Sequence, residues 1–206
     1  MKKGVKTRPD RYRDNDYAIA YHRSTNTGKR LRLSQRLELD ALEKALEHSR
    51  GAQSVLDVPC GTGRIHRALS QRFDTVVGLD SSVPMLSVYR QNDSQSLAGC
   101  ADIFALPFDD NHFDWVVSHR YFHHLHSDDD RVAVLKSLSR VARHGLIFYL
   151  WLDTPLVKRK ASMRTSIPVA SLCQCLAGAG LRLEARYNCG WPFTVKSIVV
   201  CTPVGQ

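Results

Sequence analysis

The chain contains the stretch Val55-Leu56-Asp57-Val58-Pro59-Cys60-Gly61-Thr62-Gly63-Arg64. An apolar run that ends in an acid and a glycine-containing turn predicts a buried strand that stops abruptly before a helix. Gly61 and Gly63 lack a Cβ, so the turn can be tight and a ligand can lie against its backbone. This geometry is typical of a cofactor-binding loop.

The residues around the two glycines indicate which kind of cofactor the loop suits. A dinucleotide-binding loop needs a third glycine or alanine three residues after the second, and here that position is His66. The loop also lacks the Gly-Lys-Ser or Gly-Lys-Thr of a phosphate-binding P-loop. A ligand without phosphates therefore fits the loop better.

Two later segments have a related form. Residues Thr75 to Asp80 are a second apolar run that ends in an acid, and a carboxylate at a strand end can accept hydrogen bonds from two ribose hydroxyls. The stretch Ala101-Asp102-Ile103-Phe104-Ala105-Leu106-Pro107-Phe108 then precedes a third apolar run, Trp115-Val116-Val117.

With these segments in order, residues 53 to 152 resemble the class I S-adenosylmethionine-dependent methyltransferases. The similarity is to the small group with the motifs Asp-x-Gly-Cys-Gly-Thr-Gly and Ala-Asp-x-x-x-Leu-Pro-Phe. The family usually has glycine where this chain has Pro59, and proline fixes φ and removes an N–H donor. Because Gly61 and Gly63 remain, we keep S-adenosyl-L-methionine as the expected cofactor.

The resemblance implies an α/β fold of the Rossmann-like, doubly wound type. Its seven-stranded sheet is mostly parallel, the last strand is antiparallel, and helices cover both faces. The resemblance also implies that the strand-two acid binds the ribose and that Asp102 with Ile103 reads the adenine. The residues expected to contact the cofactor are Asp57, Pro59, Gly61, Gly63, Asp80, Ser81, Asp102, Ile103 and His119.

Periodicity and capping residues predict where the elements lie. We expect helices over 34–48, with Ser34 as N-cap, and over 62–72, 127–144 and 168–179. We expect strands over 53–58, 75–79, 114–118, 146–152, 181–187 and 195–201, with Asp102 at the end of a further strand before 114.

Length and composition suit a single domain, since the chain has 206 residues of which 43% are hydrophobic. We expect a basic, tyrosine-containing cap segment over residues 1–33 and one methyltransferase domain over 34–206. The sequence shows no apolar run of membrane-spanning length, and its first residues lack the apolar middle of a signal peptide. We therefore expect a cytoplasmic protein that can associate peripherally with a membrane surface.

A histidine-rich stretch, His119-Arg120-Tyr121-Phe122-His123-His124-Leu125-His126, follows the strand over 114–118. In open α/β sheets ligands bind beyond the carboxyl ends of strands, near the point where the strand order reverses. His119 is therefore expected near the sulfonium methyl, where an imidazole can remove a proton from a hydroxyl. His119 and His123 are candidate general bases, with substrate contact and purely structural roles left open. Adjacent histidines rarely point the same way, so we expect no metal.

Two further pairs are candidates for contact with the methyl acceptor. Tyr17 and Tyr21 are four residues apart and can share a helix face that leans into the cleft, or simply pack that helix onto the domain. Lys158 and Arg159 lie in a connection that the family often uses to shape the acceptor pocket. They can bind a phosphate or carboxylate, or remain in a solvated loop.

The formal net charge of +9 attracts nucleic acid, anionic lipid and acidic metabolites alike. We favour O-methylation of a small-molecule, lipid or glycolipid-precursor acceptor, which the basic charge suits if the acceptor is anionic or membrane-associated. The alternative within enzymes is methylation of RNA. A third hypothesis is a non-catalytic cofactor-binding partner or regulatory protein, for which Pro59 is the only support.

Overall fold

The computed structural model describes residues 12–24, 29–92, 97–153, 166–190 and 194–205. The strands are β1 (Ser54–Asp57), β2 (Thr75–Asp80), β3 (Leu97–Cys100), β4 (Phe113–Ser118), β5 (Ala142–Trp151), β6 (Leu181–Asn188) and β7 (Lys196–Pro203). The helices are α2 (Asn15–Ser24), α3 (Lys29–Leu46), α4 (His66–Ser70), α5 (Val83–Asn92), α6 (Asp128–Val141) and α7 (Val169–Gly178), with 3₁₀ turns η1 (Glu47–Ser49) and η2 (Phe122–His124).

The strands form one seven-stranded sheet in the order β3-β2-β1-β4-β5-β7-β6. The pairs from β3 to β5 are parallel, whereas β7 runs antiparallel to both β5 and β6. This arrangement confirms the fold predicted from the sequence. The strand order reverses between β1 and β4, so the loops after these two strands border the same crevice, where open α/β sheets bind their ligands.

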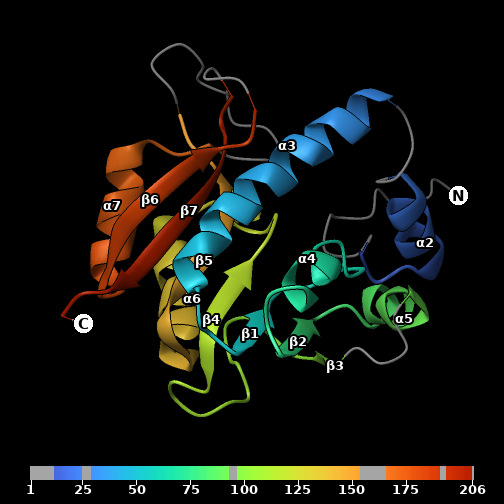
Figure 1. Cartoon of the computed structure of the whole chain (residues 1–206), viewed down its shortest axis with the longest axis horizontal. Coiled ribbons are helices and arrows are strands. Elements are labelled where there is room, and N and C mark those ends of the chain that lie inside the picture. The colour runs from blue at the N-terminus through green and yellow to red at the C-terminus, as the bar shows by residue number, and fades with distance from the viewer. Residues whose placement is uncertain (1–11, 25–28, 93–96, 154–165, 191–193, 206) are drawn as a thin grey trace, which may run out of the picture.

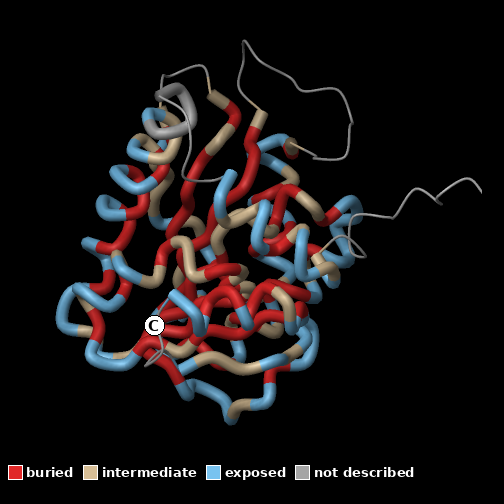
Figure 2. Tube along the Cα trace, turned by 90° about the vertical axis from the view of Figure 1, so that its right-hand side faces the viewer, coloured by how far each residue is buried: buried red, intermediate tan, exposed pale blue. Residues whose placement is uncertain are grey.

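Two apolar cores lie on the two faces of the sheet, because successive strand side chains point to opposite faces. In β5 the even-numbered residues from Leu146 to Leu150 enter the core that α6 and α7 cover, and the odd-numbered residues from Ile147 to Trp151 enter the core under α3 and α4. Helices therefore flank the sheet on both sides (Figure 1). Figure 2 shows the corresponding layering, with buried chain in the middle and exposed helix faces outside.

The start of the first predicted helix was wrong. Helix α3 begins at Lys29 and continues through Ser34, so Ser34 does not cap it. The Ser34 hydroxyl instead accepts a hydrogen bond from Lys196 Nζ at 2.9 Å. The proposed division of the chain between residues 33 and 34 stays a prediction, although α3 runs across it.

Three other boundaries differ for identifiable reasons. Helix α4 begins only at His66, because turns occupy the residues before it. Strand β5 begins at Ala142, and Arg143, which we expected to end a helix, lies in this strand and pairs with Asp114 at 2.6 Å. Asp102 lies two residues beyond the end of β3, in a turn where its Oδ1 accepts the Phe104 N–H at 3.0 Å.

Helix α5 packs onto the loop after β1 through one aromatic ring. A Cβ at Gly63 would lie 2.2 Å from the Tyr89 ring, and one at Gly78 would lie 2.6 Å from it. The Tyr89 hydroxyl is 2.6 Å from His66 Nδ1. Gly63 therefore serves the packing of Tyr89, whereas Gly61 has open space around its missing Cβ.

Replacing Gly63 by alanine should destabilise the fold. The backbone at Gly63 has φ +77° and the new methyl would overlap the Tyr89 ring, so we expect the free energy of unfolding to fall by about 2–4 kcal/mol. Urea unfolding followed by circular dichroism measures this change.

Gly180→Ala is the matched control, since Gly180 has φ +70° but nothing near its missing Cβ. It should cost only the backbone strain, about 1–2 kcal/mol. Equal losses in the two variants would show that the Tyr89 ring does not constrain residue 63.

Candidate active site

A cavity of about 510 Å³ lies at the carboxyl ends of β1, β2 and β4. Its volume is in the range of small-molecule and cofactor sites. Of the residues predicted from the sequence, those that line the cavity are Tyr21, Asp57, Pro59, Gly61, Asp80, Ser81 and His119. Those that lie outside its lining are Tyr17, Gly63, Asp102, Ile103 and His123. Lys158 and Arg159 fall outside the residues that the structure describes.

Asp57 gives the cavity a carboxylate that other protein groups do not satisfy. Both of its side-chain oxygens are buried and have no hydrogen-bond partner among the described residues. Burial, followed by the nearby charge of Asp80, raises the pKa of Asp57 well above its usual range. A buried carboxylate without a partner is costly. The arrangement therefore fits a ligand that brings a positive charge or hydrogen-bond donors.

Asp80 ties the glycine loop to the end of β2. Its Oδ2 accepts the Gly61 N–H and its Oδ1 accepts the Ser82 N–H, both at 2.8 Å. Burial nevertheless raises the pKa of Asp80, and these backbone hydrogen bonds only reduce the increase. Each carboxylate oxygen has a further lone pair, so the ribose contact expected of Asp80 is compatible with this geometry.

The residues expected at the adenine lie near the cavity without lining it. Ile103 is buried in the core between the sheet and α6, and Asp102 is held by its turn with Phe104. Tyr121 does line the cavity, and burial together with the charge of Asp102 raises the pKa of Tyr121 to about 12. The adenine roles of Asp102 and Ile103 stay predictions.

Three histidines of the stretch after β4 line the cavity, namely His119, His124 and His126, and of these we take His119 as the candidate base. It lines the cavity, and its Nε2 is buried without a hydrogen-bond partner among the described residues. Burial lowers the pKa of His119 to about 3, with Glu38 opposing the shift and Arg120 and Arg64 adding to it. The imidazole is therefore neutral at physiological pH.

The structure does not bring His123 into the cavity. Its ring is buried and stacks on Trp151, with centroids 5.2 Å apart and planes 10° from parallel. The Trp151 indole N–H in turn donates to the Tyr149 hydroxyl at 2.9 Å. Of the roles left open for His123, the packing role is the one that this position supports.

The N-terminal segment covers one side of the cavity. In Figure 1 helix α2 lies beside α5, and the structure packs the rings of Tyr12, Tyr17 and Tyr21 with Met85 of α5. The Tyr12 carbonyl accepts a short hydrogen bond from the Ser82 hydroxyl. Tyr21 faces the cavity, whereas Tyr17 packs against the other two tyrosine rings.

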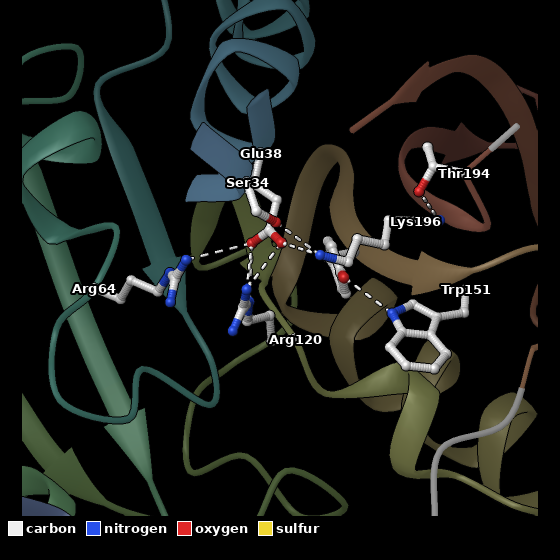
Figure 3. A network of polar contacts seen from close by, with 8 residues as sticks. Ser34, Glu38, Arg64, Arg120, Trp151, Thr194 and Lys196 are labelled. Carbon is white, nitrogen blue, oxygen red and sulfur yellow. Dashed lines mark hydrogen bonds and ion pairs between the residues drawn. The ribbon is translucent and has the colours of Figure 1, made fainter. Parts of the chain in front are cut away.

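A network around Glu38 was not predicted from the sequence. The Glu38 side chain is fully buried and accepts hydrogen bonds from Arg120 at 2.7–2.9 Å, Lys196 at 3.0 Å and Arg64 at 3.4 Å. Figure 3 shows the three cationic side chains converging on this carboxylate. Burial opposes ionisation, but Arg120 and the other cationic neighbours lower the pKa of Glu38 below its usual value.

A signal for this network was present in the sequence. Glu38 is three, four and seven residues before Ala41, Leu42 and Ala45, so it lies on the apolar face of its helix. A charged residue on a buried face needs oppositely charged partners. The sequence could thus reveal that Glu38 is paired, although not with which cations.

The fold, the strand-end acids and the cavity are those expected of a class I S-adenosylmethionine-dependent methyltransferase domain. Comparison with known proteins agrees: residues 56–150 match the family model described as a methyltransferase domain. The resemblance predicted from the sequence is confirmed, and this class of domain uses S-adenosylmethionine.

Curated relatives and a solved structure show how wide the similarity is. The chain is 25% identical over 150 residues to the probable tRNA methyltransferase 9B of Homo sapiens, covering 71% of this chain and 32% of that protein. It is 40% identical over 114 residues to the malonyl-[acyl-carrier protein] O-methyltransferase of Pseudescherichia vulneris, covering 54% and 43%. The chain thus spans less than half the length of either relative.

The structural match covers almost the whole fold. Magnesium protoporphyrin IX methyltransferase from Synechocystis PCC 6803, solved with bound S-adenosylhomocysteine, superposes with a TM-score of 0.76. The match covers 94% of this chain and 97% of that one at 16% identity, so it bears on the fold alone.

The described ranges contain neither a membrane-spanning helix nor a metal-binding cluster of side chains. Within these ranges the helices are too short or too polar to cross a membrane. Histidine, cysteine, aspartate and glutamate side chains also do not gather there in a group that could hold a metal ion.

Asp57→Asn should stabilise the protein when no cofactor is present. Because the folded-state pKa of Asp57 is raised, the ionised carboxylate destabilises the fold at neutral pH, and this cost disappears as the pH falls toward the unfolded pKa. At pH 7 we expect the amide to raise the free energy of unfolding by about 1–3 kcal/mol, with a smaller gain at pH 4. Urea unfolding at both pH values measures the effect.

Asp114→Asn provides a control of opposite sign. The Asp114 carboxylate accepts the Gln53 and Ser54 N–H groups and pairs with Arg143, and these partners outweigh burial and lower its pKa. This variant should lose stability at pH 7. A loss of stability in Asp57→Asn as well would contradict the view that Asp57 lacks a partner.

Proposed function

We propose that this protein transfers the methyl group of S-adenosylmethionine to an oxygen atom of a small-molecule, lipid or glycolipid-precursor acceptor. The observation that carries this proposal is that two acidic side chains and a neutral imidazole line the same cavity. The strand-end carboxylates of Asp57 and Asp80 line it together with the neutral imidazole of His119, whose Nε2 has no hydrogen-bond partner among the described residues.

The acidic side of the cavity suits the cofactor. When bound, S-adenosylmethionine supplies an electrophilic methyl group on a positively charged sulfur. Asp57 complements positive charge, and Asp80 keeps lone pairs for hydroxyl donors while it holds the Gly61 backbone in place. Pro59 lines the cavity without an N–H to donate, so this assignment rests on the carboxylates and on Gly61.

His119 is the proposed proton acceptor. A hydroxyl oxygen that gains a methyl group becomes far more acidic than any imidazolium, so a weakly basic imidazole suffices to take its proton. The buried Nε2 of His119 is the atom suited to this transfer. Burial lowers the pKa of His119 and Glu38 opposes this shift, so the Glu38 carboxylate favours the imidazolium that forms.

The dimensions of the cavity favour a small acceptor or the narrow end of a longer one. A volume of about 510 Å³ must accommodate cofactor and acceptor group together. Tyr12, Arg13 and Tyr21 line one part of it, which limits water and holds the reacting groups in place.

RNA methylation is the second candidate function. It is supported by the similarity to the probable tRNA methyltransferase 9B and by the formal charge of +9. Binding of RNA should weaken steeply between low and physiological salt, whereas the binding of a small acceptor inside the cavity should depend less on salt.

The match to a methyltransferase domain favours an enzyme over a non-catalytic cofactor-binding protein.

The test is transfer of a tritiated methyl group from S-adenosylmethionine to extracts of the source organism, separated into small-molecule, lipid and RNA fractions. We expect label in the small-molecule or lipid fraction. Because the pKa of His119 is about 3, the rate should not fall between pH 8 and pH 5 through protonation of this residue. Label in the RNA fraction alone would favour the second candidate.

His119→Asn should lower the rate of methyl transfer by roughly 100-fold while the affinity for S-adenosylhomocysteine stays within about twofold. His112→Asn is the matched control, because His112 is exposed and lies outside the cavity lining. A normal rate in His119→Asn would exclude His119 as the proton acceptor.

A further inference from the structure

We propose that Arg64 and Arg120 bind an oxyanion of the methyl acceptor, a carboxylate or a phosphate, on the side of the cavity away from Asp57 and Asp80. This inference rests on the proposed function and extends it by naming the charge of the acceptor. It assigns to two described arginines the role that the sequence suggested for Lys158 and Arg159.

The guanidinium of Arg64 is largely buried and has few hydrogen-bond partners among the described residues. Its side chain is only 17% exposed and lines the cavity. Among the described residues its guanidinium makes one hydrogen bond, a long one of 3.4 Å to Glu38. A guanidinium carries five N–H donors, and a buried cation normally has close, hydrogen-bonded partners. The unmet donors of Arg64 therefore suit an anionic ligand.

Arg120 is held in a fixed position beside Arg64. Its Nε and Nη2 donate to Glu38 at 2.7–2.9 Å, whereas Nη1 makes no hydrogen bond to the part of the chain that is described. The backbone of Arg120 has φ 61°, a left-handed conformation that is strained for a residue with a side chain. Such strain gathers at functional sites, where the surrounding structure maintains it.

The charges of the network leave a positive surplus at the two arginines. Arg64, Arg120 and Lys196 converge on the single carboxylate of Glu38. The Lys196 ammonium is well satisfied, because it donates to both Glu38 and Ser34 at about 3 Å. Burial and the neighbouring Arg120 lower the pKa of Arg64, as expected where positive charge exceeds negative charge.

The topology separates this surplus from the cofactor side. Asp57 and Asp80 end β1 and β2, whereas Arg120 follows β4 and Lys196 begins β7. In the strand order these two groups lie on opposite sides of the point between β1 and β4 where the order reverses. Arg64 comes from the loop after β1 but reaches across to Glu38 (Figure 3). An oxyanion there therefore belongs with the acceptor.

The experiment is calorimetric titration of inorganic phosphate and of acetate into the protein, with and without saturating S-adenosylhomocysteine, at constant ionic strength. Wild type should bind at least one of the two anions in the millimolar range. Arg64→Gln should weaken that binding at least about tenfold while leaving the affinity for S-adenosylhomocysteine within about twofold. The anion that binds more tightly indicates whether the acceptor carries a phosphate or a carboxylate.

Arg67→Gln is the matched control. It removes the same charge three residues away, from a side chain that is exposed and outside the cavity lining. It should leave anion binding unchanged. Absence of anion binding to wild type, or equal binding in Arg64→Gln, would overturn the inference. A tenfold loss of S-adenosylhomocysteine affinity in Arg64→Gln would overturn it too, since the oxyanion would then be the cofactor's own carboxylate.

The two proposals can fail separately. If wild type does not bind S-adenosylhomocysteine, the methyltransferase function fails. Phosphate or acetate binding to the ligand-free protein that is lost in Arg64→Gln would still support the oxyanion site.

Discussion

The burial of the Glu38 carboxylate is the constraint on which the arrangement around the cavity depends. A carboxylate with a fully buried side chain needs cations, and here they come from the loop after β1, the loop after β4 and the start of β7. These segments are far apart in the chain, so the ion pairs hold α3 across the sheet. The same contacts hold Arg64 and Arg120 in the lining of the cavity. Glu38 therefore positions the two arginines of the proposed oxyanion site.

The opposite side of the cavity shows the reverse arrangement. Asp57 is buried without a partner among the described residues, and Asp80 is engaged by backbone N–H groups. A fold optimised only for stability would not keep an unsatisfied carboxylate in this position. Asp57 and Asp80 thus line the cavity at the ends of β1 and β2, whereas Arg120 lines it after β4. Arg64 and the neutral imidazole of His119 line it as well. The proposed oxyanion site depends on this distribution of charge.

The parts that sequence patterns predicted correctly are those set by local rules. The apolar runs ending in Asp57 and Asp80 are strands, and Ser127 caps α6 by accepting the Asp130 N–H. The errors arose where distant residues decide. The helix predicted over 127–144 ends at Val141, because Arg143 pairs with Asp114 within the sheet. Gly145 also belongs to β5, where its missing Cβ lets the strand approach the Cys201 carbonyl. Glu38 finds partners as distant in sequence as Lys196, which helical periodicity cannot reveal.

Fold similarity does not identify the acceptor, because one fold supports many reactions, and the relatives of this chain are named for tRNA and for malonyl-[acyl-carrier protein]. The proposed function and the assignment of the oxyanion site to the acceptor both require that S-adenosylmethionine binds at the strand-end acids Asp57 and Asp80. Calorimetric titration of S-adenosylhomocysteine into wild type and Asp80→Ala tests it most directly, with the melting curve of each protein as a check of folding. We expect micromolar binding to wild type that weakens at least about tenfold in the variant. Absence of binding to wild type, or equal affinity in a folded Asp80→Ala, would contradict it.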